Sequence, residues 1–272
     1  MSLGRLTVIF ESSIVKGIPH ILTVLVLTSC EGIFQGIYDD GPTEQQQPSV
    51  APKNATEGKL YVDASDWTKW HYIDLKAAIA DTDSTSTTEW TVFDIPTQAV
   101  TGQDSRAGIY NYWYDVFGLG ISNHEFRSFT PTAPQPEPPS WTIAVHRNNV
   151  RTNGGAVIET DFSSIAHLPD DISSIVQGKT FAEDEWDELN VWTVQSQMLS
   201  GIIGNQGINI NKQLSSWLRV DIPPMPPVFT LNNHVFILRL ADGTYAALQL
   251  ENYQSQKGVK CCLTINYKYP LQ

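Results

Sequence analysis

Residues 234–254, HVFILRLADGTYAALQLENYQ, contain two apolar runs that are separated by Asp242-Gly243. Asp-Gly between two such runs is a strong short-range signal for a β-hairpin. Many other segments are rich in β-branched and aromatic residues, and no long segment shows a convincing 3.6-residue period. These patterns predict a mainly β fold, in which antiparallel sheets form a single domain over residues 59–272 with long loops.

The remaining predicted strands share this composition and are EWTVFDI (89–95), WTIAVHRNNVRT (141–152), GGAVIETDF (154–162), LNVWTVQS (189–196), WLRVDI (217–222) and VKCCLTINYKY (259–269). The proline-rich stretches 130–140 and 222–227 are predicted to be loops, because proline cannot donate a hydrogen bond to a sheet. Residues 199–216 contain three glycines and predict a long hairpin or a mobile flap. Residues 104–120 are compatible with a short helix.

The composition excludes several functional classes. The 272 residues include 41% hydrophobic side chains, which suits a globular protein. The formal net charge of −12 and the absence of a basic stripe argue against nucleic acid as a partner. The sequence has no GxSxG, no HExxH and no persuasive carboxylate pair, so we do not expect an enzyme. The acidic run 182–188, AEDEWDE, is interpreted as a solvated face.

The N-terminal segment has the features of a secretory signal. Lys16 precedes an apolar run that ends in Leu27-Thr28-Ser29-Cys30, which matches the bacterial lipobox. We therefore predict a signal peptide over 1–29, a lipidated Cys30, and a flexible tether over 30–58. The alternative reading is a buried strand. The apolar run 18–27 is too short to span a bilayer, so only the lipid would hold the protein at the membrane.

Cys261 and Cys262 are the two cysteines that remain after Cys30. Adjacent residues on a strand point to opposite faces, so we expect one thiol to face a core and the other to face away. No spacing typical of a zinc site or of a disulfide framework is present. A vicinal disulfide is a less favoured alternative.

Three segments resemble the HmuY-like haem-binding lipoproteins of Bacteroidota. Residues 141–160, WTIAVHRNNVRTNGGAVIET, resemble the strand-turn-strand signature of that family. Residues 61–75, YVDASDWTKWHYIDL, are similar to its first strand, and LNNHVFILRLADGTYAALQLENYQ with GVKCCLTINYKYP is similar to its C-terminal hairpin and last strand. Residues 81–140 resemble an insertion whose role the sequence leaves open.

The resemblance implies a haemophore rather than an enzyme. It implies a mainly β domain whose long loops bind haem b (iron protoporphyrin IX) through two axial side chains. It also implies a lipoprotein on the outer membrane and cell surface, or released from it, that delivers haem to a TonB-dependent receptor. Host haemoproteins are the expected source of the haem.

The resemblance places the axial ligands between the signature hairpin and the C-terminal hairpin, at roughly 185–230. This region has no histidine, but it contains Met198 and Met225, the only methionines besides Met1. Met thioether is an accepted axial ligand of haem iron. The four prolines around Met225 would hold this weak ligand in place and reduce the ordering entropy lost on binding. We therefore expect Met198 and Met225 to be the ligands; the alternative is that both are apolar fillers.

The histidines of the mature chain are assigned lesser roles. His71, His146 and His234 lie in predicted strands and are expected to be packed or hydrogen-bonded. His124 and His167 remain reserve candidates for the haem iron.

Aromatic residues near the two methionines are candidates for the haem pocket. Trp192, Trp217 and Phe229 are expected to contact the porphyrin, although each is equally compatible with a place in the core. The eight tryptophans also keep a second hypothesis open, in which a surface lipoprotein of the same fold binds a glycan or a protein partner.

Overall fold

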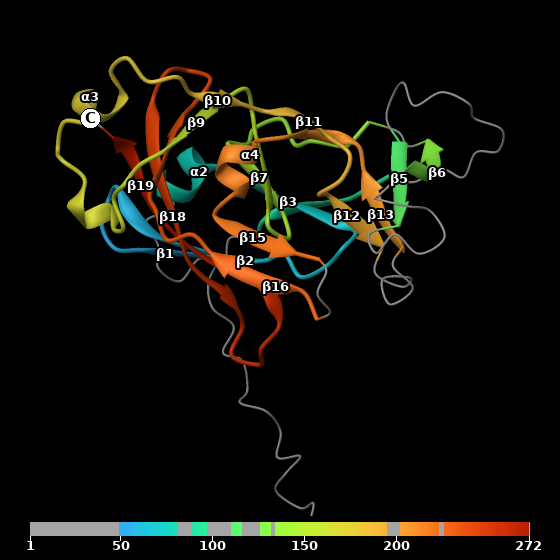
Figure 1. Cartoon of the computed structure of the whole chain (residues 1–272). Coiled ribbons are helices and arrows are strands. Elements are labelled where there is room, and N and C mark those ends of the chain that lie inside the picture. The colour runs from blue at the N-terminus through green and yellow to red at the C-terminus, as the bar shows by residue number, and fades with distance from the viewer. Residues whose placement is uncertain are drawn as a thin grey trace, which may run out of the picture. The chain divides into compact units, whose positions relative to one another are not determined.

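The protein is described here from a computed structural model. The described residues are 49–80, 89–96, 110–115, 126–131, 134–194, 202–222 and 226–271. They form a mainly β domain of antiparallel sheets, as the sequence predicts (Figure 1).

The main sheet has seven strands in the order β1-β2-β19-β18-β17-β9-β10, and each strand is antiparallel to its neighbours (Figure 1). Their bounds are β1 (Val50–Pro52), β2 (Glu57–Asp63), β19 (Lys260–Leu271), β18 (Tyr245–Gln254), β17 (Phe236–Arg239), β9 (Ala156–Glu159) and β10 (Ala182–Glu183). The C-terminal strands β18 and β19 are the longest of these and lie in the interior of the sheet. They lie between the N-terminal strands β1 and β2 on one side and β17, β9 and β10 on the other.

A second sheet has the order β4-β3-β7-β8. Its strands are β4 (Thr91–Asp94), β3 (Lys69–Ile73), β7 (Ile143–His146) and β8 (Asn149–Thr152). The largest apolar cluster contains buried side chains from both sheets, among them Val145, Val150, Phe236 and Leu263. Burial of apolar surface between the two sheets is thus the main source of stability.

Smaller elements complete the described structure. A four-stranded sheet contains β12 (Trp192–Val194), β13 (Ile202–Gln206), β5 (Tyr110–Asp115) and β6 (Phe126–Pro131), in that order. Two ribbons pair β11 (Glu185–Asp187) with β14 (Ile208–Ile210), and β15 (Leu218–Asp221) with β16 (Val228–Leu231). The helical segments are α2 (Leu75–Ala80), η1 (Ile165–His167), α3 (Ser173–Val176) and α4 (Lys212–Ser215). Among the described residues, none of the helices has the length and apolar character needed to cross a bilayer.

The predicted hairpin is confirmed as β17 and β18, whose registered pairs include Arg239 with Tyr245. Gly243, in the predicted Asp242-Gly243 turn, has a φ of 85°, and Gly154, in the turn between β8 and β9, has a φ of 67°. Both angles lie in the left-handed region, which glycine adopts without the steric cost that a Cβ brings. The two glycines therefore allow these tight turns, and the predicted turn at Asp242-Gly243 is confirmed.

The described structure includes strands on the N-terminal side of the boundary expected at residue 59. Strand β1 lies inside the expected tether of 30–58, pairs with β2, and buries Val50 in the main core. The polar composition of 30–58 conceals this strand, because only three residues pair and a single apolar side chain is buried. The predicted tether would accordingly end before Val50.

Two loop or helix expectations are wrong in the described parts of their segments. Residues 110–115, within the expected short helix, form strand β5. The expected flap of 199–216 contains β13, β14 and α4 rather than one long hairpin. Asn211 begins α4 by accepting a hydrogen bond from the Leu214 N–H at 2.9 Å, so the segment is capped and packed.

The acidic run 182–188 is only partly a solvated face. Asp187 is buried, and its Oδ1 accepts the N–H groups of Leu189 and Asn190. Asp184 accepts two hydrogen bonds from Thr152, while burial raises the pKa of its carboxyl. These two carboxylates organise turns, which local charge patterning does not reveal.

The two adjacent cysteines differ in burial, as predicted, and they are not joined in a disulfide. Cys261 is buried, and Cys262 is half-buried. Burial raises the pKa of the Cys261 thiol.

Candidate ligand-binding site

The turn between β7 and β8 holds two separate parts of the chain. The Asn149 side chain donates to the carbonyl oxygen of Asn190 at 2.8 Å, just before β12. The Asn148 side chain donates to the carbonyl oxygen of Leu218 at 3.1 Å, in β15. Two neighbouring asparagines therefore fix the strands that lead into residues 195–201 and into residues 223–225.

An aromatic and basic stack covers the same turn. The Arg147 guanidinium lies 4.2 Å from the centre of the Trp67 ring and donates to the Ser65 carbonyl oxygen at 2.8 Å. Trp67 stacks on Trp192 with ring centres 6.0 Å apart and an interplanar angle of 21°. Both indoles are half-buried, so they retain apolar surface that a flat ligand can contact.

The β15–β16 ribbon is tied to the core by its first residues. Trp217 is fully buried in the main cluster, and its Nε1–H donates to the Asn148 carbonyl oxygen at 3.0 Å. On the other strand, Phe229 stacks on Tyr253 with ring centres 5.7 Å apart, and the Lys260 ammonium lies 5.6 Å from the Phe229 ring. The ribbon is thereby anchored on both strands next to the segment that carries Met225.

Several predicted site residues lie outside the described residues. They are Cys30, His124, Met198 and Met225. Their flanking elements are described: residues 195–201 separate β12 from β13, and residues 223–225 lie between β15 and β16. The axial pair therefore stays a prediction.

The three predicted aromatic contacts differ in exposure. Trp192 and Phe229 are half-buried; Trp192 lies on β12, which precedes residues 195–201, and Phe229 lies on β16, which follows residues 223–225. Trp217 is fully buried, with its only polar atom satisfied inside the protein. A side chain without accessible surface cannot contact a ligand, so Trp217 is a core residue rather than a contact of the porphyrin.

The described histidines are held by the fold or are remote from the stack. His146 is fully buried, its Nε2 lies 3.0 Å from the Trp67 carbonyl oxygen, and burial lowers its pKa to about 4. His71 is also buried with a lowered pKa, and His234 pairs with Glu159 at 2.7 Å. His167 is exposed on η1, a segment that contacts β18 and β19.

Sequence reasoning missed Trp67 and Arg147. Trp67 lies in the stretch 61–75 that carries the family resemblance, but nothing local marks it as a partner of Trp192. Their contact joins residues that are far apart in sequence, and only the fold brings them together. Among the described residues, no group of three His, Cys, Asp or Glu side chains is arranged to hold a metal ion directly.

Comparison with known proteins identifies the family. The HmuY protein family profile matches residues 66–267. A lipoprotein of Bacteroides fragilis has 28% sequence identity and a TM-score of 0.59, over 82% of this chain and 96% of that protein. An HmuY-like heme-binding protein of Bacteroides vulgatus has 29% identity and a TM-score of 0.55, over 82% and 97%.

An apo HmuY analogue of Tannerella forsythia, at 17% identity, shares the fold with a TM-score of 0.56 over 79% of this chain and 96% of that one. No curated protein matches the chain. The family match covers most of the chain and includes every strand of the second sheet. The chain therefore belongs to the HmuY family.

Proposed function

We propose that this protein is a haemophore that binds haem b between the segments 195–201 and 223–225. Family membership and the 29% identical protein described as heme-binding support this assignment. The observation that carries it is the β7–β8 turn, whose two asparagines hold the strands leading into both segments. A ligand that is bound from two sides requires two binding segments whose relative position is fixed by one part of the fold.

Met198 and Met225 are the proposed axial ligands, one from each segment. Thioether sulfur is soft and neutral, so it favours ferrous over ferric iron. It has no proton to lose near neutral pH, so protons compete little with the iron. The prolines on both sides of Met225 restrict the backbone and reduce the entropy cost of ordering this ligand.

The described aromatic residues fit the wall of a porphyrin site. Trp67 and Trp192 form a half-buried stack beside the β12 end, and Phe229 lies on the strand that follows Met225. Flat apolar rings of this kind suit the face of a porphyrin. Arg147, whose guanidinium lies over the Trp67 ring, would support that ring rather than contact the ligand.

The cellular role follows from the family and the N-terminal segment. We propose that Cys30 is lipidated, that the protein is anchored at the outer-membrane surface or released from it, and that no enzymatic step is involved. Haem would be taken from host haemoproteins and passed to a TonB-dependent receptor. The lipobox and the lipoprotein of Bacteroides fragilis support this role.

An absorbance titration with haem tests the binding function. The mature protein should give a saturable shift of the Soret band with ferrous haem, with a stoichiometry of one. Trp192→Ala should weaken binding because it removes part of the wall, whereas His167→Ala should bind like the wild type. No haem-dependent Soret shift in either redox state would overturn the proposal.

A further inference from the structure

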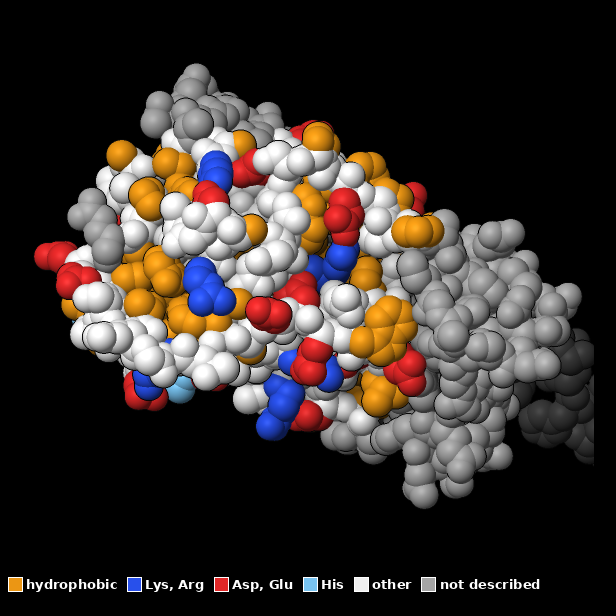
Figure 2. Space-filling view, turned by 90° about the horizontal axis from the view of Figure 1, so that it is seen from above, with side chains coloured by type: hydrophobic (Ala, Val, Ile, Leu, Met, Phe, Trp, Pro, Cys, Tyr) orange, Lys and Arg blue, Asp and Glu red, His pale blue; other side chains and the backbone are white. Residues whose placement is uncertain are grey.

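A groove lies between the β11–β14 ribbon and the proline-rich segment 134–139. Its volume is about 210 Å³. It is called the Trp186 groove here and is lined by Pro134, Gln135, Glu137, Arg151, Trp186 and Asn209. Figure 2 views the molecule from above, the side of β10 and β11 in Figure 1, and shows acidic and basic side chains beside exposed hydrophobic ones.

Trp186 supplies an exposed aromatic surface. It lies on β11 opposite Asn209 of β14, and 43% of the residue is exposed. An exposed indole beside a cavity is unusual, because tryptophan is highly buried on average. Its Nε1–H is 3.4 Å from the Glu188 carboxylate, which helps to orient the ring.

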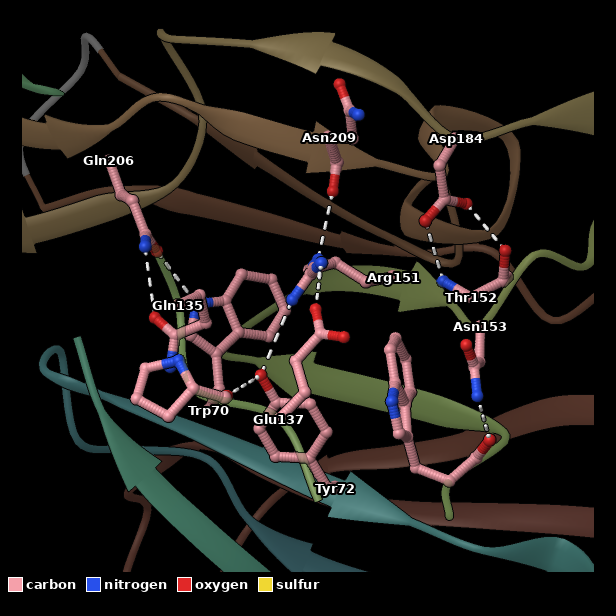
Figure 3. Close-up of polar contacts among 12 residues, drawn as sticks. Trp70, Tyr72, Gln135, Glu137, Arg151, Thr152, Asn153, Asp184, Gln206 and Asn209 are labelled. Carbon is pink, nitrogen blue, oxygen red and sulfur yellow. Dashed lines mark hydrogen bonds and ion pairs between the residues drawn. The ribbon is translucent and has the colours of Figure 1, made fainter. Parts of the chain in front are cut away.

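Arg151 sits at the floor of the groove and fixes a carboxylate. Its side chain is only 13% exposed, and its guanidinium donates to Glu137 Oε1 at 2.6 Å and to the Asn209 carbonyl oxygen at 3.2 Å (Figure 3). The guanidinium also lies 5.6 Å from the Trp70 ring and 5.5 Å from the Trp141 ring. The Glu137 carboxylate, whose side chain is 38% exposed, is thus held in one orientation at the groove surface.

A chain of hydrogen bonds fixes the opposite wall. The Trp70 indole donates to Gln206 Oε1 at 2.8 Å, and Gln206 Nε2 donates to Gln135 Oε1 at 3.0 Å (Figure 3). The Tyr72 hydroxyl donates to the Pro136 carbonyl oxygen at 2.7 Å. Because prolines restrict this segment further, its polar groups are preorganised before any ligand arrives.

From this arrangement we infer that the Trp186 groove binds a neutral glycan. An exposed indole offers its apolar face to the C–H face of a sugar ring. The planar groups of Glu137, Gln135 and Asn209 offer hydrogen-bonding atoms to sugar hydroxyls. Arg151 and Glu137 compensate each other's charge, so the pair favours a neutral sugar over an anionic one.

The groove is separate from the proposed haem site. None of the residues that line the groove belongs to the segments 195–201 and 223–225 or to the Trp67–Trp192 stack. Glycan binding is therefore expected to persist when the two methionines are replaced, and the inference does not depend on haem binding.

Affinity electrophoresis of the mature protein tests this inference. The gels would contain amylopectin, xylan, yeast mannan or pectic galactan as neutral probes, with heparin as an anionic probe. At least one neutral polysaccharide should retard the wild type, and Trp186→Ala should raise the apparent dissociation constant at least tenfold. Glu137→Gln, which keeps the shape but loses the charge, should weaken retardation by a smaller factor.

Val92→Ala serves as the matched control, because Val92 is an exposed apolar residue that does not line the groove. This variant and the double variant Met198→Leu/Met225→Leu should migrate like the wild type. Retardation by heparin alone would overturn the choice of a neutral ligand. No retardation by any neutral probe, or full retardation of Trp186→Ala, would overturn the glycan site.

Discussion

Replacing Trp217 with phenylalanine separates a core role from a ligand-contact role. Trp217 is fully buried, and its indole N–H donates to the Asn148 carbonyl oxygen at 3.0 Å. Phenylalanine keeps an aromatic ring but cannot donate this hydrogen bond. It also leaves space in a cluster that contains side chains from both large sheets.

The expected loss has two parts. A buried carbonyl left without its partner costs about 1–3 kcal/mol, and the smaller ring leaves a cavity that costs roughly 1 kcal/mol more. Trp217→Phe should therefore lower the free energy of unfolding by about 2–4 kcal/mol. For a domain of this size, a loss of about 3 kcal/mol lowers the melting temperature by roughly 6–12 °C.

Urea denaturation followed by circular dichroism measures this loss. Trp186→Phe is the matched control, because its ring is exposed and a surface substitution should change stability by less than about 0.5 kcal/mol. Haem affinity of folded Trp217→Phe should equal that of the wild type. Unchanged stability together with weakened haem binding would refute the assignment of Trp217 to the core.

Other substitutions probe the fold at separate places. Burial lowers the pKa of His146 to about 4, below its ordinary 6.5. Between these two values only the unfolded state binds the proton, so the folded state is at its full stability above pH 6.5 and loses stability as the pH falls toward 4. Between pH 7 and pH 5 the wild type should lose about 2 kcal/mol more than His146→Gln in urea denaturation; equal losses would contradict the burial argument. Gly58→Ala should destabilise by about 1–3 kcal/mol, because a Cβ there would lie 2.6 Å from a backbone oxygen of β1; a melting temperature like that of the wild type would refute the clash. In native protein that begins after Cys30, a thiol reagent should label Cys262 well before Cys261, because Cys261 is buried and burial raises the pKa of its thiol. Mass spectrometry of the labelled peptides measures this order, and earlier labelling of Cys261 would contradict the prediction.

The sequence predicts most of the strands, because their signals are local. Alternation and β-branched composition mark β2, β3, β7, β8, β9, β17, β18 and β19, and Asp242-Gly243 marks the turn between β17 and β18. The sequence pattern does not reveal strand β1, because it is short and is stabilised by pairing with β2. The helix expected within 104–120 is wrong for residues 110–115, because a short apolar run fits a strand as well as a helix.

The site was less predictable because its contacts are long-range. Asn148 and Leu218 are separated by 70 positions, and Asn149 and Asn190 by 41. No periodicity in the sequence reports such pairs, so only the fold reveals that one turn holds both segments proposed to carry the axial ligands. The same holds for Trp217, whose pattern fits a ligand contact as well as a core residue until its burial is known.

A ferrous haem titration of Met198→Leu/Met225→Leu beside the wild type tests the ligand assignment most directly. Leucine keeps an apolar side chain of similar size but removes the sulfur, so the fold and the pocket wall should persist. Ferrous binding should weaken at least tenfold and the ligand-field spectrum should change, whereas His167→Ala should retain both. Wild-type affinity and spectrum in the double leucine variant would contradict methionine ligation.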